Sequence, residues 1–414
     1  MGFVIRTDAG TYRANWRDAT GRQKAKTFPT KRQARDFLAE TEAALSRGTY
    51  VDPHAGRVLF EVYAAKWTAG RNDEVVTIAR DASVMRHRVL PRWGAVPVGR
   101  INHSDVQQWA TELGQRLAPA TVRECCRLLR AVLALAVRDR IIAENPADGV
   151  RLPKRRRTDA DEQVITREAF AALLPEIPER YRALVALAGG TGLRWGECVG
   201  LTWDAIDLDK ATVKVSRVGV EVAGTVTFKP YPKSRAGRRT VPLPPFAVRE
   251  LRRHRKAVPP GAAGEVFTNE AGGSMRRTVF RAWIWRPALV RAGLLGQVAQ
   301  VGPRAWRATW RDRDGNEVSE ELPNRRVARA RVSRMAQGGL RFHDLRHSYA
   351  TWLITDGVPL NDVARVMGHE QISTTLDRYT HAFEAGADRV RESFADFPLT
   401  SDEDDHQKGG KEVA

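Results

Sequence analysis

The sequence predicts a multidomain α+β protein. Residues 12–48 change from alternating apolar and polar positions to a helical pattern, which predicts a small strand–strand–helix domain. Residues 58–149 keep apolar positions at helical spacing, which predicts an all-helical domain without strands. Residues 163–398 are mostly helical in pattern, with a strand-rich stretch near 206–243 that predicts a small antiparallel sheet. A length of 414 residues is enough for two or three domains.

The first domain is expected to span residues 1–52. The stretch "TYRANWRDATGRQKAKTFPT" alternates on both sides of Gly21, which predicts two strands joined by a turn. Thr30 and Gln33 then form a capping-box pattern at the start of a helix. Gly48 stands where a glycine commonly ends a helix.

The remaining segments follow from composition. A long helix is expected from Pro119, in "PATVRECCRLLRAVLALAVRDR", with its two cysteines packed inside the helical domain. Residues 150–162 are basic and contain proline, which predicts a linker. The third domain covers residues 163–398, and the polar residues 399–414 are expected to be disordered.

The charge of the chain points to a polyanionic partner. There are 68 Lys and Arg against 49 Asp and Glu, which gives a formal net charge of +19. Nucleic acid is therefore the first partner to consider, and a merely basic protein is the alternative. Three cysteines, Cys125, Cys126 and Cys198, fit neither a disulfide framework nor a zinc spacing, so we expect a reduced, cytoplasmic setting. No signal-peptide core or bilayer-spanning run is present, and no membrane association is expected.

The stretch "RFHDLRHSYATWL" places His343 and His347 four residues apart, with Arg346 between them. Two histidines at this spacing begin many zinc sites, but an adjacent arginine would repel the cation. No HExxH glutamate and no cysteine cluster supplies further ligands. We therefore predict no metal, and expect the cation and imidazoles to share a helix face that suits a phosphate. Leu345, Tyr349, Trp352 and Leu353 are expected to form a separate, apolar stripe.

Three other short stretches carry candidate functional residues. "TGLRWGE" predicts a tight turn that presents Arg194, with Glu197 able to orient it. "YPKSRAGRRTVPL" places Lys233 at a turn between strands, and "MGHEQISTTLDRYTH" presents His369 and Tyr379. Taken singly, each of these side chains is more commonly a surface or structural residue; their order and spacing together are the informative feature.

In that order and spacing the sequence resembles the tyrosine recombinases of the phage-integrase family. The boxes "TGLRWGE", "PKSRAGRRTVPL", "HDLRH" and "GHEQISTTLDRYTH" match across residues 191–381. More weakly, residues 58–149 resemble the family's core-binding domain, and residues 1–52 resemble the arm-binding domain of the phage type. No catalytic position departs from the family pattern.

The resemblance implies a role for each matched residue. Tyr379 would be the nucleophile, Lys233 the general acid, and Arg194 and Arg346 the phosphate clamp. His343 and His369 would bind the scissile phosphate and assist proton transfer, while Glu197 and Asp344 would support the others. The expected enzyme breaks and rejoins DNA without metal, ATP or another cofactor. Two basic clusters are expected to contact DNA: Arg13, Arg17, Arg22, Lys24 and Lys26, and Lys154, Arg155 and Arg156.

The resemblance also implies partners for the protein, and it leaves alternative functions open. Double-stranded DNA with core and arm-type sites, a homotetramer on that DNA, and an accessory bending or directionality factor are expected. A cellular dimer-resolution recombinase and a type IB topoisomerase share the chemistry, but neither explains residues 1–52. A catalytically inactive DNA-binding regulator would be expected to lack one of the catalytic side chains, and all are present.

Residues 297–338 form an insertion relative to the family pattern. "WRATWRDRDGNEVSEELPNRRVARARV", from 306, aligns without gaps on "YRANWRDATGRQKAKTFPTKRQARDFL", from 12, with ten of 27 positions identical. Coincidence in an Arg- and Ala-rich chain is the alternative. A second copy of the first domain predicts two antiparallel strands and a helix over 306–335. Its second strand is acidic, so we expect weak DNA binding or a protein contact there, although the arginines of its helix could reach a DNA backbone.

Overall fold

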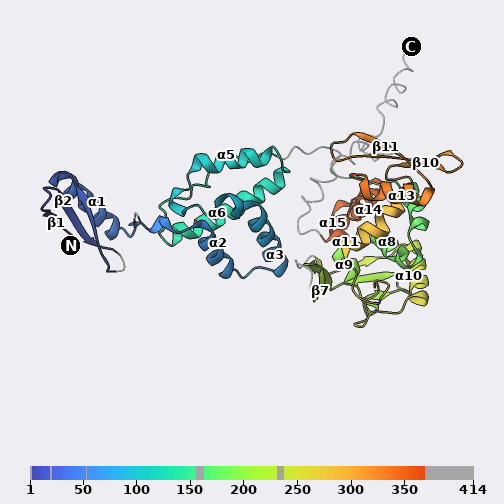
Figure 1. Ribbon diagram of the computed structural model, residues 1–414. Coiled ribbons are helices and arrows are strands. Elements are labelled where there is room, and N and C mark those ends of the chain that lie inside the picture. Colours follow the sequence, from blue (N-terminus) through green and yellow to red (C-terminus); the bar gives the residue numbers. More distant parts are fainter. Residues whose placement is uncertain (1, 19–20, 53, 155–162, 231–236, 369–414) are drawn as a thin grey trace, which may run out of the picture. The chain divides into compact units, whose positions relative to one another are not determined.

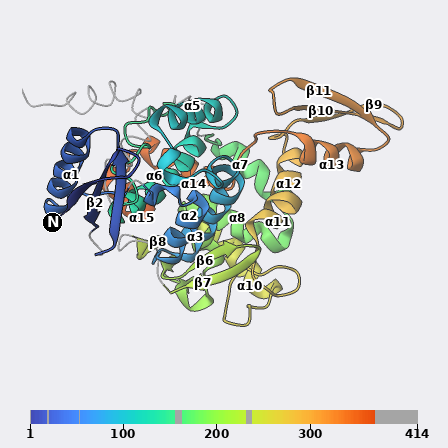
Figure 2. The same ribbon diagram turned by 60° about the vertical axis from the view of Figure 1, so that its left-hand side comes forward.

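The computed structural model describes residues 2–18, 21–52, 54–154, 163–230 and 237–368 (Figures 1 and 2). The chain divides into two compact units, residues 1–158 and 159–414. The family-level expectation of a mostly helical protein with small antiparallel sheets is confirmed in the described residues.

The N-terminal unit begins with a three-stranded antiparallel sheet in the order β1-β2-β3, followed by a helix. These elements are β1 (Phe3–Arg6), β2 (Tyr12–Arg17), β3 (Gln23–Phe28) and α1 (Lys31–Ser46). Ala14 and Trp16 of β2 pack on Ala34 and Leu38 of α1 to form a small core. The two strands and the helix were predicted, whereas β1 was not. We call residues 2–46 the N-terminal module.

Helices make up the rest of this unit, as predicted for residues 58–149. They are α2 (Phe60–Ala69), α3 (Val75–Val84), α4 (Leu90–Trp93), α5 (His103–Gly114) and α6 (Pro119–Arg138), with a π-helical turn η2 (Met85–Val89) between α3 and α4. Cys125 and Cys126 are buried on the apolar stripe of α6, as expected for packing residues.

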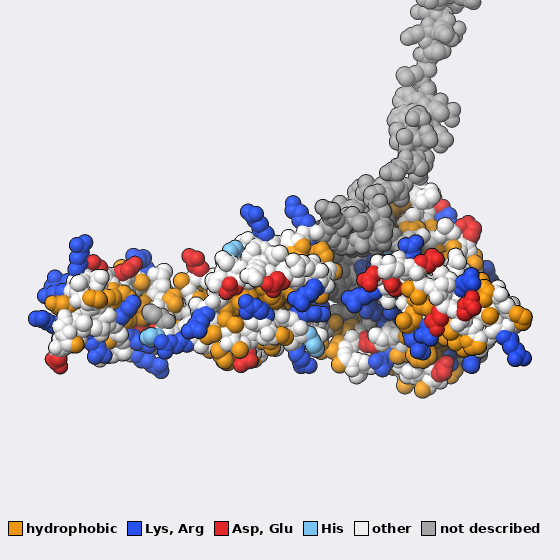
Figure 3. Space-filling model, turned by 45° about the horizontal axis from the view of Figure 1, so that its top comes forward, with side chains coloured by type: hydrophobic (Ala, Val, Ile, Leu, Met, Phe, Trp, Pro, Cys, Tyr) orange, Lys and Arg blue, Asp and Glu red, His pale blue; other side chains and the backbone are white. Residues whose placement is uncertain are grey.

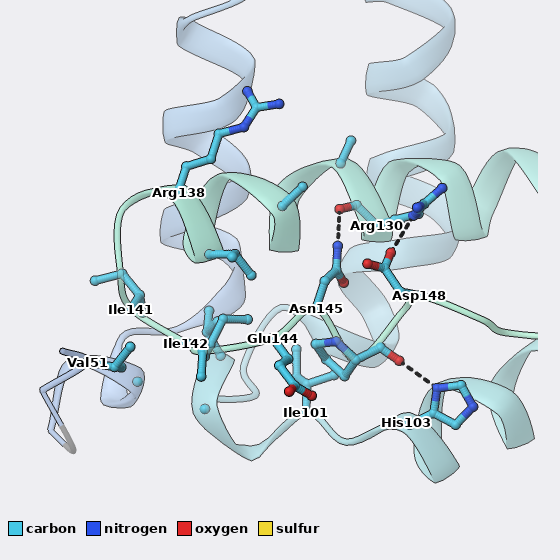
Figure 4. A pocket seen from close by; sticks show the side chains of 18 of the residues that line it. Val51, Ile101, His103, Arg130, Arg138, Ile141, Ile142, Glu144, Asn145 and Asp148 are labelled. Atoms are coloured by element: carbon cyan, nitrogen blue, oxygen red, sulfur yellow. Dashed lines mark hydrogen bonds and ion pairs between the residues drawn. The ribbon is translucent and has the colours of Figure 1, made fainter. Parts of the chain in front are cut away.

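A cavity of about 1300 Å³ opens beside α6 in this unit (Figure 4). Several of its polar side chains have partners in the cavity wall: Arg130 pairs with Asp148 at 2.5 Å, and Asn145 donates to the Arg130 carbonyl at 3.0 Å. Nδ1 of His103 lies 3.1 Å from the Pro146 carbonyl. These contacts fasten residues 145–148 to the neighbouring helices, which indicates a structural role.

The C-terminal unit is built around α8 (Glu179–Thr191), which is buried on all sides from Ala183 to Thr191. The other helices are α7 (Arg167–Leu173), α9 (Trp195–Val199), α10 (Pro245–Ala257), α11 (Arg277–Phe280), α12 (Arg286–Arg291), α13 (Arg325–Met335), α14 (Asp344–Thr355) and α15 (Leu360–Met367). A π-helical turn η8 (Arg281–Trp285) joins α11 to α12. Helices α10 and α14 both pack on α8.

The strands predicted near 206–243 form a sheet and a hairpin. The sheet has the order β4-β5-β8, from β4 (Ile206–Asp207), β5 (Thr212–Val215) and β8 (Arg239–Pro242). The hairpin pairs β6 (Val218–Val222) with β7 (Thr225–Lys229).

The insertion forms a second three-stranded antiparallel sheet with a helix. Its strands are β9 (Gln297–Gly302), β10 (Ala305–Arg311) and β11 (Glu317–Leu322), followed by α13. The two strands and helix predicted for 306–335 are present, and β9 is an additional strand. Figure 2 shows this sheet and α13 standing out from the other helices of the C-terminal unit. We call residues 296–337 the insert module.

The two modules share the same strand register. Tyr12 pairs with Phe28, and Trp306 pairs with Leu322. The two partners are separated by the same number of residues in both pairs. All six β2–β3 pairs have a counterpart between β10 and β11, and the four β1–β2 pairs have one between β9 and β10. The turns also match, since Gly21 and Gly315 have φ angles of 83° and 87°.

The glycine before each first strand is constrained in the same way. A Cβ on Gly2 would lie 2.4 Å from the Leu38 side chain, and one on Gly296 would lie 2.5 Å from the Val332 side chain. Leu38 and Val332 are equivalent helix positions, so the same close approach of strand and helix is built twice. Shared register, turns and packing favour duplication over a coincidence of composition.

Arg286 attaches the insert module to α12. Its buried guanidinium donates to the carbonyls of Ser333 at 2.6 Å and Gly338 at 3.2 Å, and also to that of Ala336. These carbonyls lie at or just beyond the C-terminal end of α13, where a cation is favoured. The contact fixes α13 against α12 a few residues before the "HDLRH" box.

Candidate active site

The turn after α8 places Arg194 as predicted from "TGLRWGE". Helix α8 ends at Gly192, which is left-handed with φ 63°. A Cβ there would lie 2.6 Å from the Tyr349 ring and 3.0 Å from Sδ of Met367, so only glycine fits. Two residues later Arg194 caps the N-terminus of α9.

Glu197 is the buried carboxylate that holds this turn. It accepts from the backbone nitrogen of Arg194 at 2.9 Å and from Nη1 of Arg194 at 2.8 Å. Burial alone would raise its pKa, but the guanidinium groups of Arg239 and Arg194 outweigh burial and lower the pKa to about 2. The carboxylate is therefore ionised at neutral pH, and it orients Arg194 in the way the sequence suggested.

Arg239 is a site residue that the sequence did not reveal. Its guanidinium donates to both oxygens of Glu197, at 3.2 and 3.0 Å. Nε donates to the Val366 carbonyl at 2.6 Å, so Arg239 joins β8, α9 and α15. The stretch "GRRTVPL" contains two adjacent arginines, and only the alternation of β8, with Arg239 and Val241 inward, shows which one is buried.

Arg346 lies at the meeting point of two helix ends. It projects from α14, donates to the Gly192 carbonyl at 2.7 Å, and donates to the Met367 carbonyl at 2.5 Å. Both carbonyls are at helix C-termini, where partial negative charge stabilises a guanidinium. The contact with Gly192 brings Arg346 next to the turn that carries Arg194. Arg346 is 2% exposed, whereas the Arg194 side chain is 42% exposed.

Helix α14 is more buried than its sequence suggests. All residues from Asp344 to Ala350 are buried, so the polar face expected for Arg346 and His347 faces protein and not solvent. The sequence pattern, which separates an apolar stripe from a polar face, did not predict that the polar face would also be buried. The reason is that helix ends and backbone carbonyls from α8 and α15 cover the polar side.

Asp344 supports the start of α14. Its buried carboxylate accepts from the backbone nitrogen of Arg341 at 2.6 Å and from Nη2 of Arg341 at 2.6 Å. The Asp344 carbonyl in turn accepts from the Ser348 hydroxyl, which itself accepts from the Ile165 nitrogen. The described contacts of the Asp344 carboxylate therefore fix the residues that precede His343.

His343 is placed to meet an anion. Its ring lies 5.2 Å from that of His347, nearly perpendicular to it. Partial desolvation, His347, Arg346 and Arg194 all disfavour the imidazolium and hold the pKa of His343 below its ordinary value. The side chain is nevertheless exposed to solvent on its outer side. It is therefore a neutral hydrogen-bonding group at pH 7, and a bound phosphate would raise its pKa.

Several predicted residues lie outside the described residues: Lys233, His369, Tyr379, Arg155 and Arg156. Lys154 is described and exposed. The structure brings Arg194, Glu197, His343 and Arg346 together in the C-terminal unit, and adds Arg239.

The basic residues predicted for the N-terminal module divide between its two faces. Arg13 and Arg17 are exposed on the sheet face turned away from α1, and Arg22 is exposed in the turn. Lys24 and Lys26 lie on the α1 side of β3. Lys24 pairs with Asp52 at 2.5 Å, and the Lys26 ammonium lies 4.8 Å from the centre of the Phe37 ring. Arg13, Arg17, Arg22 and Lys26 are exposed, whereas Lys24 is half-buried.

Lys and Arg side chains are scattered over the surface drawn in Figure 3 and outnumber Asp and Glu in the sequence, in keeping with the net charge of +19. Within the described ranges, no three His, Cys, Asp or Glu side chains are grouped to hold a metal ion. No helix in the described part of the chain is long and apolar enough to cross a membrane.

Arg239→Gln is expected to destabilise the C-terminal unit by about 3–5 kcal/mol at pH 7, because it breaks a buried ion pair. The depressed pKa of Glu197 contributes stability that is present above its unfolded value near 4.5 and is lost as the pH falls towards 2. The difference in free energy of unfolding between Arg239→Gln and the wild type should therefore become smaller as the pH falls from 4.5 to 2. Urea unfolding across this range measures it, with the exposed neighbour in Arg238→Gln as the matched control. An equal loss in both variants would contradict this role for Arg239.

Comparison with known proteins decides the family. A sequence model of the Phage integrase family matches residues 163–385, more than half of the chain. The chain belongs to the phage integrase family. It is a tyrosine recombinase, an enzyme that breaks and rejoins DNA at specific sites.

Individual relatives extend this match. The chain is 24% identical to the integrase of Mycobacterium phage L5 over 383 residues, which is 91% of each protein. It is 25% identical to a XerC-like tyrosine recombinase of Caldanaerobacter subterraneus over 297 residues, 68% of this chain and 67% of that one.

Solved structures share the fold of this integrase. An integrase of transposon Tn1549 in complex with circular intermediate DNA matches with a TM-score of 0.60 and 21% identity, covering 81% of this chain and 99% of that one. A lambda integrase dimer bound to a core site matches with a TM-score of 0.52 and 14% identity, covering 91% and 93%.

Proposed function

We propose that this integrase inserts and excises a mobile element by cleaving DNA through Tyr379 and holding the cut strand as a 3′-phosphotyrosine. The observation that carries the proposal is the convergence of Arg194 and Arg346, which are far apart in the sequence. Arg346 donates to the carbonyl of Gly192, two residues from Arg194, and Glu197 fixes Arg194 beside it. Both guanidiniums are thus held in place before DNA arrives.

Attack of a phenolate on a phosphodiester produces a five-coordinate phosphorus with added negative charge. Planar guanidiniums match this charge with paired hydrogen bonds, and their fixed positions avoid reorganisation during the reaction. Exposed Arg194 and the neutral imidazole of His343 would contact the phosphate directly. Arg346 is buried, and its positive charge would stabilise the negative phosphate without direct contact. The phosphotyrosine retains a phosphoester bond, so rejoining needs no ATP.

Lys233 is proposed to protonate the leaving 5′-oxygen, and Lys233→Ala should therefore be rescued by a 5′-thio leaving group. Sulfur leaves without a proton, so cleavage of the thio substrate should return to within a few-fold of the wild-type rate. The comparison is a single-turnover assay on oxygen- and sulfur-containing versions of one nicked site. Equal defects on both substrates would remove Lys233 from the acid role.

The N-terminal module favours a phage-type integrase over a dimer-resolution recombinase. The match to the phage L5 integrase covers 91% of both chains, whereas that to the XerC-like recombinase covers 68% of this one. We propose that the module binds arm-type DNA through its exposed sheet arginines, that residues 58–149 bind core DNA, and that residues 163–398 carry the reaction. By analogy with the lambda integrase tetramer solved on a Holliday junction, four protomers would assemble on two duplexes. An accessory bending or directionality factor would complete the assembly.

Recombination between the two attachment sites of the element that encodes this integrase tests the proposal. We expect joint products in buffer with a metal chelator and without ATP, since the proposed chemistry uses neither. Supercoil relaxation without joined products would favour a type IB topoisomerase. Binding without any strand cleavage would favour an inactive regulator.

A further inference from the structure

The insert module reproduces the fold of the N-terminal module but not its charge distribution. On the exposed face of the N-terminal sheet, Arg13 stands opposite Thr27, and Arg17 opposite Gln23. At the equivalent positions of the insert module, Arg307 stands opposite Glu321 and Arg311 opposite Glu317. Arg307 and Glu321 form an ion pair at 3.1 Å. The face that is basic in the first copy is therefore neutral in the second.

The helices of the two modules differ in the opposite sense. Helix α1 carries three basic and three acidic residues in "KRQARDFLAETEAALS". Helix α13 carries five arginines and no acidic residue in "RRVARARVSRM". Positive charge therefore lies on the exposed sheet face of the N-terminal module but on the helix of the insert module. A polyanion would contact the insert module on its helix side.

A groove of about 800 Å³ runs between α13 and the η8–α12 segment. Its walls include Arg326, Arg329 and Arg334 from α13, and Arg281 and Trp283 from η8. Trp283 is 73% exposed. None of these four arginines forms an ion pair within the described ranges of the chain. The groove therefore presents a cluster of available guanidiniums beside an exposed aromatic ring.

Arg329 lies among other guanidinium groups in the groove. Burial and the neighbouring Arg325 lower the pKa of Arg329; Glu176 opposes this, and Arg291 adds to it. The walls cannot move apart easily, because Arg286 ties the end of α13 to α12. Like charges held at fixed positions favour a ligand with several negative groups.

We propose that this groove binds the phosphate backbone of duplex DNA outside the cleavage site, an inference that rests on the proposed recombinase function. DNA is favoured over an acidic protein because guanidiniums suit phosphates bidentately and the groove belongs to the same unit as Arg194 and Arg346. The backbone lies along the arginines of α13, and Trp283 covers a deoxyribose. The neutral sheet face of the module takes no part.

The test compares two triple variants of the full chain that remove the same charge from the same module. Arg326→Gln, Arg329→Gln and Arg334→Gln alter the groove. Arg307→Gln, Arg311→Gln and Arg331→Gln, the matched control, lie outside the groove lining. Affinity for a core site with flanking duplex is measured between about 50 and 200 mM salt, where each phosphate contact adds about 0.9 to the slope of log affinity against log salt. Hydroxyl-radical footprinting locates the contacted backbone.

We expect the groove variant to lower the slope by about 2 to 3 and to lose protection at flanking phosphates, while the control keeps both. Equal slopes and footprints in the two variants would overturn the proposal. So would an unchanged slope with weaker association between DNA-bound protomers, which would assign the groove to a protein partner. Cleavage of a short nicked core site distinguishes failure of the groove proposal from failure of the recombinase function. The groove variant should cleave this site at the wild-type rate. Failure of the wild-type protein to cleave it would count against the recombinase function.

Discussion

Tyr379→Phe abolishes formation of the covalent protein–DNA adduct and leaves DNA binding within a few-fold of wild type; this is the largest effect we expect. Phenylalanine keeps the ring and removes the attacking oxygen, so no nucleophile remains for the phosphodiester. The measurement is trapping on a nicked suicide substrate, with binding followed separately by gel shift.

Tyr349 and Tyr63 are poor substitutes for Tyr379 as a nucleophile. The phenol of Tyr349, on the same helix as Arg346, is buried, and burial raises its pKa. Tyr63 donates to Asp139, and burial together with that carboxylate raises its pKa to about 12. Tyr349→Phe is therefore the matched control and should still trap. Adduct formation by Tyr379→Phe would show that the nucleophile is another residue.

Arg346→Lys is expected to lower the rate of strand cleavage on the order of 10²- to 10³-fold, although the charge is kept. The guanidinium bridges the carbonyls of Gly192 and Met367, which end α8 and α15. A single ammonium cannot make both contacts, so its charge would not be held in the same position beneath the phosphate. Single-turnover cleavage measures the effect, and thermal unfolding shows whether the fold is retained.

Arg365→Lys provides the control for this prediction. Arg365 lies on the adjoining helix α15, is largely exposed, and pairs with Asp362 at 2.7 Å. Its replacement should leave cleavage within a few-fold of wild type. A similar rate for Arg346→Lys and the wild type, in a folded protein, would exclude Arg346 from the phosphate clamp.

Local patterns predicted much of the fold, because turns and helix starts depend on nearby residues. Gly21 and Gly315 mark turns that require a left-handed backbone conformation, which glycine adopts easily. Thr30 caps α1, as its spacing from Gln33 suggested. The short strands β1 and β9 were missed because four to six residues of weak alternation do not stand out before pairing. Their existence depends on the neighbouring strand, which a local pattern does not show.

Arg194 and Arg346 were predicted from the order and spacing of short sequence boxes that resemble a family pattern, and not from residue type alone. Arg239 could not be predicted, because its role depends on Glu197 and Val366, which lie far away in the sequence. The burial of α14 was missed for the same reason. The carbonyls that accept from Arg346 lie at the ends of α8 and α15, and such carbonyl partners leave no pattern in the sequence.

The most direct test of the central claim is identification of the residue and the DNA end joined in the trapped adduct. A nicked attachment site is incubated with the wild-type integrase, the adduct is digested with protease and nuclease, and the linked peptide is sequenced by mass spectrometry. We expect a nucleotide attached through its 3′-phosphate to Tyr379. A 5′-phosphate linkage, or attachment to any other side chain, would contradict it.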